Sequence, residues 1–150
     1  MSKPKASGRN ILVPVDGSPP SRRAAIQAAA LARRLKGRLV ALHVITPFEA
    51  YAYGEALPAV ITRADFQEHA MRASGKILSG ALKSAAGTPC IGRTAWNVSA
   101  ADAIAKAARA EQCSLIVMGS HGRRGLKRLL LGSVAQKVLA RSRVPVMICR

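Results

Sequence analysis

The sequence predicts a single α/β domain built on a parallel β-sheet, and three observations support that prediction. The chain has 150 residues, a common length for one domain that leaves little room for two. Apolar residues make up 49% of it, enough for a hydrophobic core. Short apolar runs alternate with segments of helical periodicity, in the order β-α-β-α-β-α-β-α-β. Such alternation is typical of a parallel sheet with helices on both faces and right-handed crossovers.

The expected strands are apolar runs without polar alternation, so both faces of each strand should be covered. They span residues 11–15, 39–45, 88–94, 115–118 and 144–148. The third run contains Pro89 and Gly92, and the last contains Pro145. Proline lacks a backbone N–H and is confined to sheet edges, so both of these strands are expected at an edge.

Capping residues and apolar stripes predict four helices. They run from Ser18 to about Leu35, from Thr62 to Gly87, from Ser99 to about Gln112, and from Ser133 to about Ala140. Pro19 and Pro20 suit the first turn of the first helix, and Gly37 suits a left-handed cap at its end. Residues 46–61 are expected to form a loop, and residues 1–9 a disordered basic tail before a domain spanning 10–150.

The charge balance favours anionic partners. Lysine and arginine number 24 against 7 aspartates and glutamates, a formal net charge of +17. Aromatic residues are only 3%, which argues against recognition by base stacking. The three cysteines form no metal-binding spacing, and no apolar run suits a secretory signal or a membrane span. We therefore expect a cytoplasmic protein with reduced thiols and no membrane partner.

The segment from Gly119 to Ser133 has the features of a polyphosphate cradle. Its glycines let an anion approach bare backbone, and the helix that opens at Gly132 and Ser133 offers free N–H groups, including that of Val134. Four basic residues add positive field nearby: Arg123, Arg124, Lys127 and Arg128. The segment matches neither the P-loop nor the G-x-G-x-x-G dinucleotide pattern. The alternative is a loop whose glycines serve tight turns and whose arginines are merely solvated.

For three other polar residues, a structural role is an alternative to a functional role. Asp16, at the end of the first strand, could contact a ligand at the sheet's switch point or serve as a turn and cap residue. His121 could act as a general base, but no partner nucleophile or second base is visible, and a loop role is favoured. His43, inside an apolar strand, is expected to be a hydrogen-bonded core or edge histidine.

Gly119, Gly122, Gly132 and Ser133 reproduce the spacing G-x2-G-x9-G-[ST], which resembles the ATP-binding signature of the universal stress protein family. The resemblance extends over nearly the whole chain, from about Asn10 to Arg150. Further segments that resemble the family are residues 11–18, 42–44, 115–122 and 144–146.

The resemblance implies a five-stranded sheet in the order 3-2-1-4-5, one ATP per subunit, and a homodimer. Its implied contacts run from base to phosphates. The adenine would be lined by Pro14, Val15 and Val44, and the ribose would be contacted by Asp16. The region of the ribose and phosphates would be flanked by Met118, Gly119 and Gly122. The phosphates would be held by Gly132, Ser133 and Val134. No carboxylate cluster is evident, so any Mg²⁺ would be held by the nucleotide phosphates.

The sequence departs from the family pattern before the fourth strand, at Cys113 and Ser114, and around Gly92, and its charge is unusually high. The function expected first is an ATP-binding sensor or adaptor in the stress response, with at most slow ATP hydrolysis. The alternatives are a basic dimer that binds nucleic acid or acidic partners without nucleotide, and a slow ATP hydrolase. The apolar last strand predicts a homodimer through residues 143–149.

Overall fold

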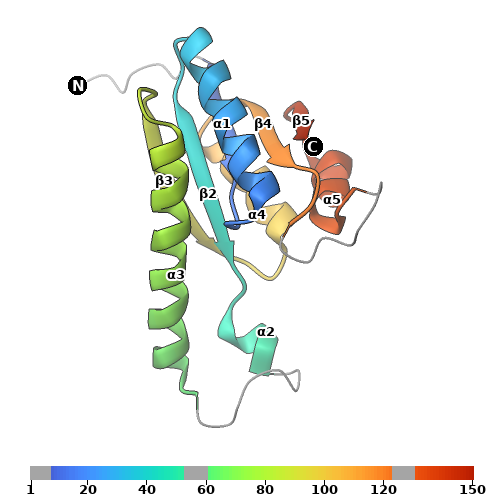
Figure 1. Ribbon diagram of the computed structural model, residues 1–150. Coiled ribbons are helices and arrows are strands. Elements are labelled where there is room, and N and C mark those ends of the chain that lie inside the picture. The colour runs from blue at the N-terminus through green and yellow to red at the C-terminus, as the bar shows by residue number, and fades with distance from the viewer. Residues whose placement is uncertain (1–7, 53–60, 123–130) are drawn as a thin grey trace, which may run out of the picture.

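The chain forms a five-stranded, all-parallel sheet in the order β3-β2-β1-β4-β5 with helices on both faces (Figure 1). A computed structural model describes residues 8–52, 61–122 and 131–150. The strands are β1 (Asn10–Pro14), β2 (Leu39–Ile45), β3 (Cys90–Trp96), β4 (Cys113–Gly119) and β5 (Val146–Cys149), and the helices are α1 (Pro19–Arg34), α2 (Phe48–Ala52), α3 (Arg63–Ser84), α4 (Ala100–Ala110) and α5 (Ser133–Arg141). The predicted fold class and strand order are confirmed.

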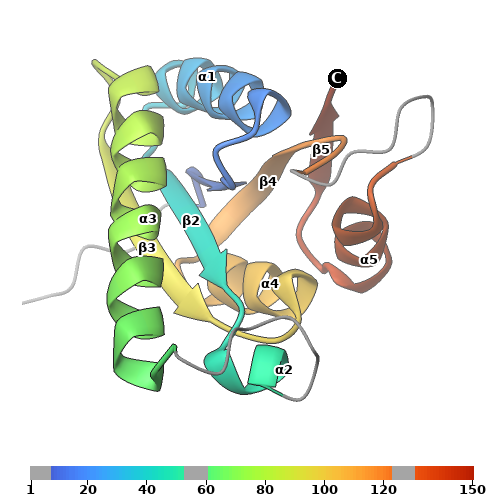
Figure 2. The same ribbon diagram turned by 60° about the horizontal axis from the view of Figure 1, so that its bottom comes forward.

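The sheet separates two apolar cores, because neighbouring residues of a strand point to opposite faces. Ile11 and Val13 of β1 pack with α1 and α3, whereas Leu12 packs with α4 and α5. Figure 2 shows α1 and α3 on one side of the sheet and α4 and α5 on the other. The α1 face against the sheet is made of alanines, which let this helix lie close to the strands.

Helix starts follow the predicted caps. The Ser18 hydroxyl accepts a hydrogen bond from the Ser21 N–H, the Thr62 hydroxyl accepts one from Asp65, and the Ser99 hydroxyl accepts one from Asp102. These bonds satisfy N–H groups that have no partner inside the helix. Local sequence therefore defines the start of α1, α3 and α4.

The end of α1 differs from the prediction. Lys36, not Gly37, adopts the left-handed conformation, with φ of 52°. The Gly37 N–H donates to Ala32 and the Lys36 N–H to Arg33, which is the hydrogen-bond pattern of a Schellman cap. Gly37 is required for a different reason: a Cβ there would lie 2.0 Å from the Arg9 carbonyl oxygen. The requirement for glycine at this position therefore comes from Arg9, which precedes β1 and is distant in the sequence, and the local pattern does not contain this contact.

Three smaller expectations are corrected. Residues 48–52 of the predicted 46–61 loop form the short helix α2, where Phe48 and Tyr51 contact Phe66 on α3. β3 begins at Cys90, so Pro89 lies before the edge strand. Pro145 also precedes its strand, and its carbonyl accepts a hydrogen bond from the Ile116 N–H. Both strands nevertheless lie at the sheet edges, as predicted.

The cysteines are free and partly or fully buried. Burial raises the pKa of the Cys113 thiol to about 11, and the nearby Glu111 carboxylate adds to the increase. Burial also raises the pKa of the Cys90 and Cys149 thiols. None of the helices in the described ranges is long and apolar enough to cross a membrane.

Substitution of Gly37 should destabilise the fold. Gly37→Ala places a methyl group against rigid Arg9 backbone, and we expect a loss of about 1–3 kcal/mol in the free energy of unfolding. Gly80→Ala, on the open face of α3, is the matched control and should not reduce stability, because alanine favours helix. Urea unfolding of the two variants measures the difference. Equal stability of the Gly37→Ala variant and the wild type would contradict the tight approach.

The homodimer expected through residues 143–149 can be tested at the β5 edge. The Pro145 carbonyl accepts a bond from Ile116 of β4 and the Cys149 carbonyl one from Ser120, directly after β4. The backbone groups of Val146 and Ile148 therefore point to the open edge. Val146→Pro removes an outward N–H and should give a monomer, whereas Val146→Ala should remain a dimer. Light scattering after size exclusion should give twice the chain mass of 15.8 kDa for the wild type. A monomeric wild type would rule out the dimer.

Candidate functional site

Two loops singled out by the sequence meet at the carboxyl edge of the sheet, between β1 and β4. From β1 the chain crosses to β2 on one side, whereas β3 connects to β4 on the other side of β1. In open α/β sheets, ligands bind at such a point of reversal. The loop after β1 contains Asp16, and the loop after β4 begins at Ser120, so their meeting defines the candidate site.

Asp16 has the turn role that its sequence position suggests. Its Oδ1 accepts a hydrogen bond of 2.9 Å from the Ser18 N–H, and Gly17 between them has a φ of 81°. Its Oδ2 faces Gly122, where a Cβ would lie only 2.8 Å from that oxygen. The structure therefore places the Asp16 carboxylate directly beside the glycine of the second loop.

Gly119 at the end of β4 lets α1 begin close to the sheet. A Cβ at Gly119 would lie 2.9 Å from the carbonyl carbon and from the Cβ of Pro20. Distances this short are not tolerated against a helix backbone, so a side chain here would push the start of α1 away. The first glycine of the motif thus maintains packing between α1 and β4.

The third motif glycine joins the loop after β4 to the start of α5. The Gly132 N–H donates to the Ser120 carbonyl oxygen at 2.7 Å, and the Ser120 N–H donates to the Cys149 carbonyl at 2.9 Å. A Cβ at Gly132 would lie 3.2 Å from the Ser120 oxygen and 3.9 Å from the Gly122 nitrogen. These bonds hold the end of β4, the edge of β5 and the amino terminus of α5 together.

In the described residues, the amino terminus of α5 has no side-chain cap. Gly132 is its N-cap residue and supplies no side-chain cap, and the first turn contains no acidic residue. Ser133 and Val134 are exposed. Uncapped N–H groups together with the positive end of the helix dipole favour an anion. The four basic residues expected beside them, Arg123, Arg124, Lys127 and Arg128, lie outside the described residues.

The expected apolar wall is only partly at the surface. Val15 and Met118 are about 5% exposed, and their side chains pack in the two cores rather than at the site. Pro14 and Val44 are half-buried at the carboxyl ends of β1 and β2. Of the three residues expected beside the adenine, Pro14 and Val44 keep exposed side-chain surface and Val15 is buried. Met118, expected below the ribose and phosphates, is buried as well.

Sequence reasoning missed three contacts around the site. Pro20 is the residue that excludes a side chain from Gly119, and the Ser120 carbonyl holds Gly132. The His43 Nδ1 lies 2.7 Å from the Val15 carbonyl oxygen, so this histidine is a hydrogen-bonded strand residue, as favoured, that steadies the chain before Asp16. The glycine spacing hinted at close packing but not at the partner of each glycine.

His121 is engaged within its own loop, with Nδ1 3.0 Å from the Ser120 hydroxyl. Among residues 8–52, 61–122 and 131–150, no three His, Cys, Asp or Glu side chains are grouped as metal ligands. Any divalent ion at the site would need ligands from the nucleotide or from the rest of the chain.

The chain is similar to proteins of one family. The model of the universal stress protein family matches residues 8–150. A universal stress protein of Thermus aquaticus is 34% identical over 150 residues, covering 95% of this chain and 98% of the relative. Three mycobacterial universal stress proteins are also 34% identical, but the match spans only 45% of their length.

Solved structures have the same fold. Hypothetical protein MJ0577 of Methanocaldococcus jannaschii aligns with a TM-score of 0.77 and 25% identity over 94% of both chains. A universal stress protein in complex with cAMP aligns with a TM-score of 0.70, at 24% identity over 94% of this chain and 96% of the other. A universal stress protein from Archaeoglobus fulgidus in complex with dAMP aligns with 0.63, at 22% identity over 94% and 97%. With its family model, its strand order and its glycine motif in agreement, the chain belongs to the universal stress protein family.

Proposed function

We propose that the chain binds an adenine nucleotide, ATP in the first place, and acts as a nucleotide-dependent sensor or adaptor in the stress response. The supporting observation is the convergence of Gly119, Gly122 and Gly132 where β4 ends and α5 begins, beside Asp16. Bare backbone and an open helix amino terminus suit a chain of phosphates, and the site lies at the switch point of the sheet.

The charges of the site suggest the orientation of the nucleotide. The Asp16 carboxylate would repel a phosphate but accepts hydrogen bonds from hydroxyl groups, so the ribose belongs beside Asp16. The phosphates belong at the turn formed by Gly132, Ser133 and Val134. The Gly132 N–H is bonded to the Ser120 carbonyl, so the N–H groups of Ser133 and Val134, together with the helix dipole, favour negative charge there. Gly122, between the two, lets the backbone approach the junction of ribose and phosphate.

The base fits the apolar edge on the β2 side of Asp16. Pro14 and Val44 supply side-chain surface there, whereas the Val15 N–H is bonded to the Leu42 carbonyl and the Val15 carbonyl lies against His43 Nδ1. Met118 and Gly119 form the floor below the ribose. Two proteins of the same fold hold adenine nucleotides, cAMP in one and dAMP in the other, which supports this class of ligand.

The proposal assigns binding rather than rapid chemistry to the site. Fast phosphoryl transfer needs a positioned base or water-orienting group and a firmly held metal. In the described residues His121 is bonded to Ser120, and the expected Mg²⁺ would be held by the nucleotide phosphates. Slow hydrolysis is compatible with the proposal.

Nucleotide-free protein should be stabilised by ATP. A free-ligand concentration of about 100 times Kd adds ~2.7 kcal/mol to the free energy of unfolding. Thermal melts with ATP, ADP, AMP and cAMP should show a stabilisation for at least ATP, because it has the longest phosphate chain. Unchanged melting temperatures with all four nucleotides would refute the proposal.

Substitution of Gly122 should abolish this stabilisation. Gly122→Val inserts a branched side chain at the Asp16 carboxylate and fills the space beside the phosphates. Gly80→Val on the open face of α3 is the matched control and should retain the full ATP response. Ser133→Ala should weaken binding by about 0.5–1.5 kcal/mol, the net contribution of one hydrogen bond. A wild-type ATP response in Gly122→Val would show that the nucleotide binds elsewhere.

A further inference from the structure

A second anionic site is indicated by the distribution of charge away from the nucleotide site. The chain carries 24 basic and 7 acidic residues, so most cations have no carboxylate available. In the described residues, Glu49, Glu68, Asp102 and Glu111 each pair with an arginine. A groove lined by basic side chains that do not pair with a carboxylate of the protein is therefore a candidate site for an external anion.

Such a place is a groove of about 290 Å³ between α4 and the end of α5. The groove is lined mainly by Asn97, Asp102, Lys106, Arg109, Arg141 and Arg143. Four cations thus face one carboxylate, and that carboxylate already binds Arg141, with 2.6 Å between Arg141 Nη1 and Asp102 Oδ1. Within the described part of the chain, Lys106, Arg109 and Arg143 form no salt bridge.

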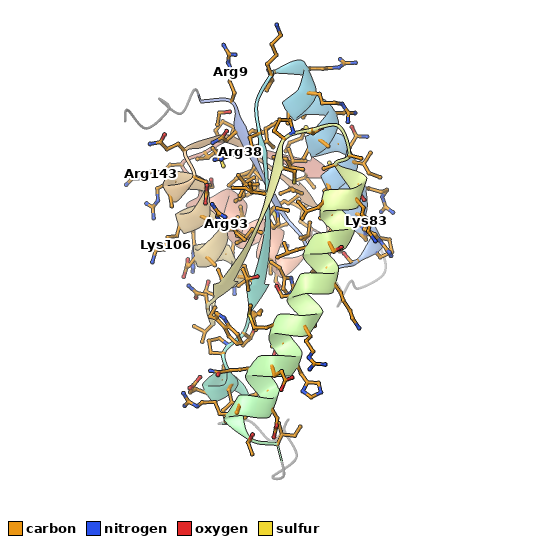
Figure 3. The ribbon with its side chains drawn as sticks, turned by 90° about the vertical axis from the view of Figure 1, so that its left-hand side faces the viewer. Arg9, Arg38, Lys83, Arg93, Lys106 and Arg143 are labelled. Atoms are coloured by element: carbon orange, nitrogen blue, oxygen red, sulfur yellow. The ribbon has the colours of Figure 1, made fainter. Side chains whose placement is uncertain are left out.

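Further cations lie at the end of α4, where Glu111, its C-cap residue, pairs with Arg38 and Arg93. In the view of Figure 3, Lys106, Arg143, Arg38 and Arg93 fall on one half of the molecule with Arg9 above, while Lys83 lies on the other half, on α3. Arg38 and Arg93 share the single carboxylate of Glu111, at 3.5 and 2.7 Å, so this pair also keeps excess positive charge. A surface longer than the groove fits an extended polyanion better than one small anion.

We propose that this basic face, centred on Lys106, Arg109 and Arg143, binds the phosphate backbone of duplex nucleic acid without regard to sequence. Double-stranded DNA carries one negative charge per about 1.7 Å of its axis and so offers successive phosphates to a row of cations. Lysine and arginine contacts to phosphate supply affinity and position, but no base specificity.

The same observations favour a duplex over a single strand. Single-strand binding relies on aromatic side chains that stack on the bases. The only aromatic residues of the chain are two Phe, two Tyr and one Trp. None of these is among the residues that line the groove. The groove can therefore recognise nucleic acid only through its positive charge, which suits the regularly spaced phosphates on the outside of a duplex.

The basic face and the nucleotide site lie at opposite ends of α5. The nucleotide site is at its start, Gly132 and Ser133, whereas the groove is at its end, Arg141 and Arg143. Nine helical residues separate the two by roughly 13 Å along the axis. Loss of one function by mutation should therefore leave the other intact.

The test compares two triple variants that remove the same charge. Lys106→Ala/Arg109→Ala/Arg143→Ala strips the groove, whereas Arg34→Ala/Lys76→Ala/Lys83→Ala strips exposed cations of α1 and α3 on the other layer. Arg143 belongs to the segment expected at the dimer interface, so light scattering first verifies that both variants keep the wild-type mass. Fluorescence anisotropy with a labelled mixed-sequence duplex of about 25 base pairs is measured from about 50 to 200 mM salt. Arg141 is retained because it pairs with Asp102.

The groove variant should bind at least roughly tenfold more weakly, and its log–log salt slope should be shallower by roughly 2–3, since each phosphate that the protein neutralises adds about 0.9 to the slope. The α1/α3 variant should keep the wild-type slope. Both variants should retain the wild-type thermal stabilisation by ATP. Failure of the duplex-binding proposal can therefore be distinguished from failure of the nucleotide-binding proposal. Equal weakening in both variants, a preference for single strands, or no duplex binding at low salt would overturn the inference.

Discussion

Close approach of the chain around three glycines at the carboxyl edge of the sheet is the constraint on which the site depends. Gly119 lies against Pro20, Gly122 against Asp16, and Gly132 against Ser120. A Cβ at Gly119 would meet the Pro20 backbone at 2.9 Å. At Gly122 it would meet the end of the Asp16 side chain, and at Gly132 a carbonyl oxygen at 3.2 Å, so Gly119 is the strictest of the three positions. Together they fix the starts of α1 and α5 relative to the ends of β1 and β4, and this arrangement leaves main-chain N–H groups as the recognising groups of the site.

The fold could be predicted from the sequence because strand burial and helix capping depend on residues that are close together in the chain. Apolar runs without alternation marked buried strands, and Ser18, Thr62 and Ser99 marked three helix starts. The predictions were wrong where a contact with a distant segment determines the local conformation. Gly37 was expected as a left-handed cap, but the constraint comes from Arg9, and Lys36 takes the strained conformation. No pattern within a ten-residue window contains that contact.

The candidate site could be predicted in its location but not in its internal contacts. The spacing of Gly119, Gly122 and Gly132 and the position of Asp16 predicted which loops would meet. The side chains of Val15 and Met118 pack on opposite faces of the sheet, Val15 with α1 and α3 and Met118 with α4 and α5, and the glycine spacing does not predict these contacts. The basic groove went unrecognised because Lys106, Arg109 and Arg143 come from two segments that only the packing of α4 beside α5 brings together.

The central claim is that main-chain amides at the start of α5 hold the phosphates of ATP. Two-dimensional ¹⁵N–¹H NMR of the nucleotide-free protein, titrated with ATP and in parallel with adenosine, tests it most directly. The account predicts that the amide resonances of Gly122, Ser133 and Val134 shift strongly with ATP and much less with adenosine. Unmoved amides at these three positions, with shifts confined to the surface around Lys106 and Arg109, would contradict it.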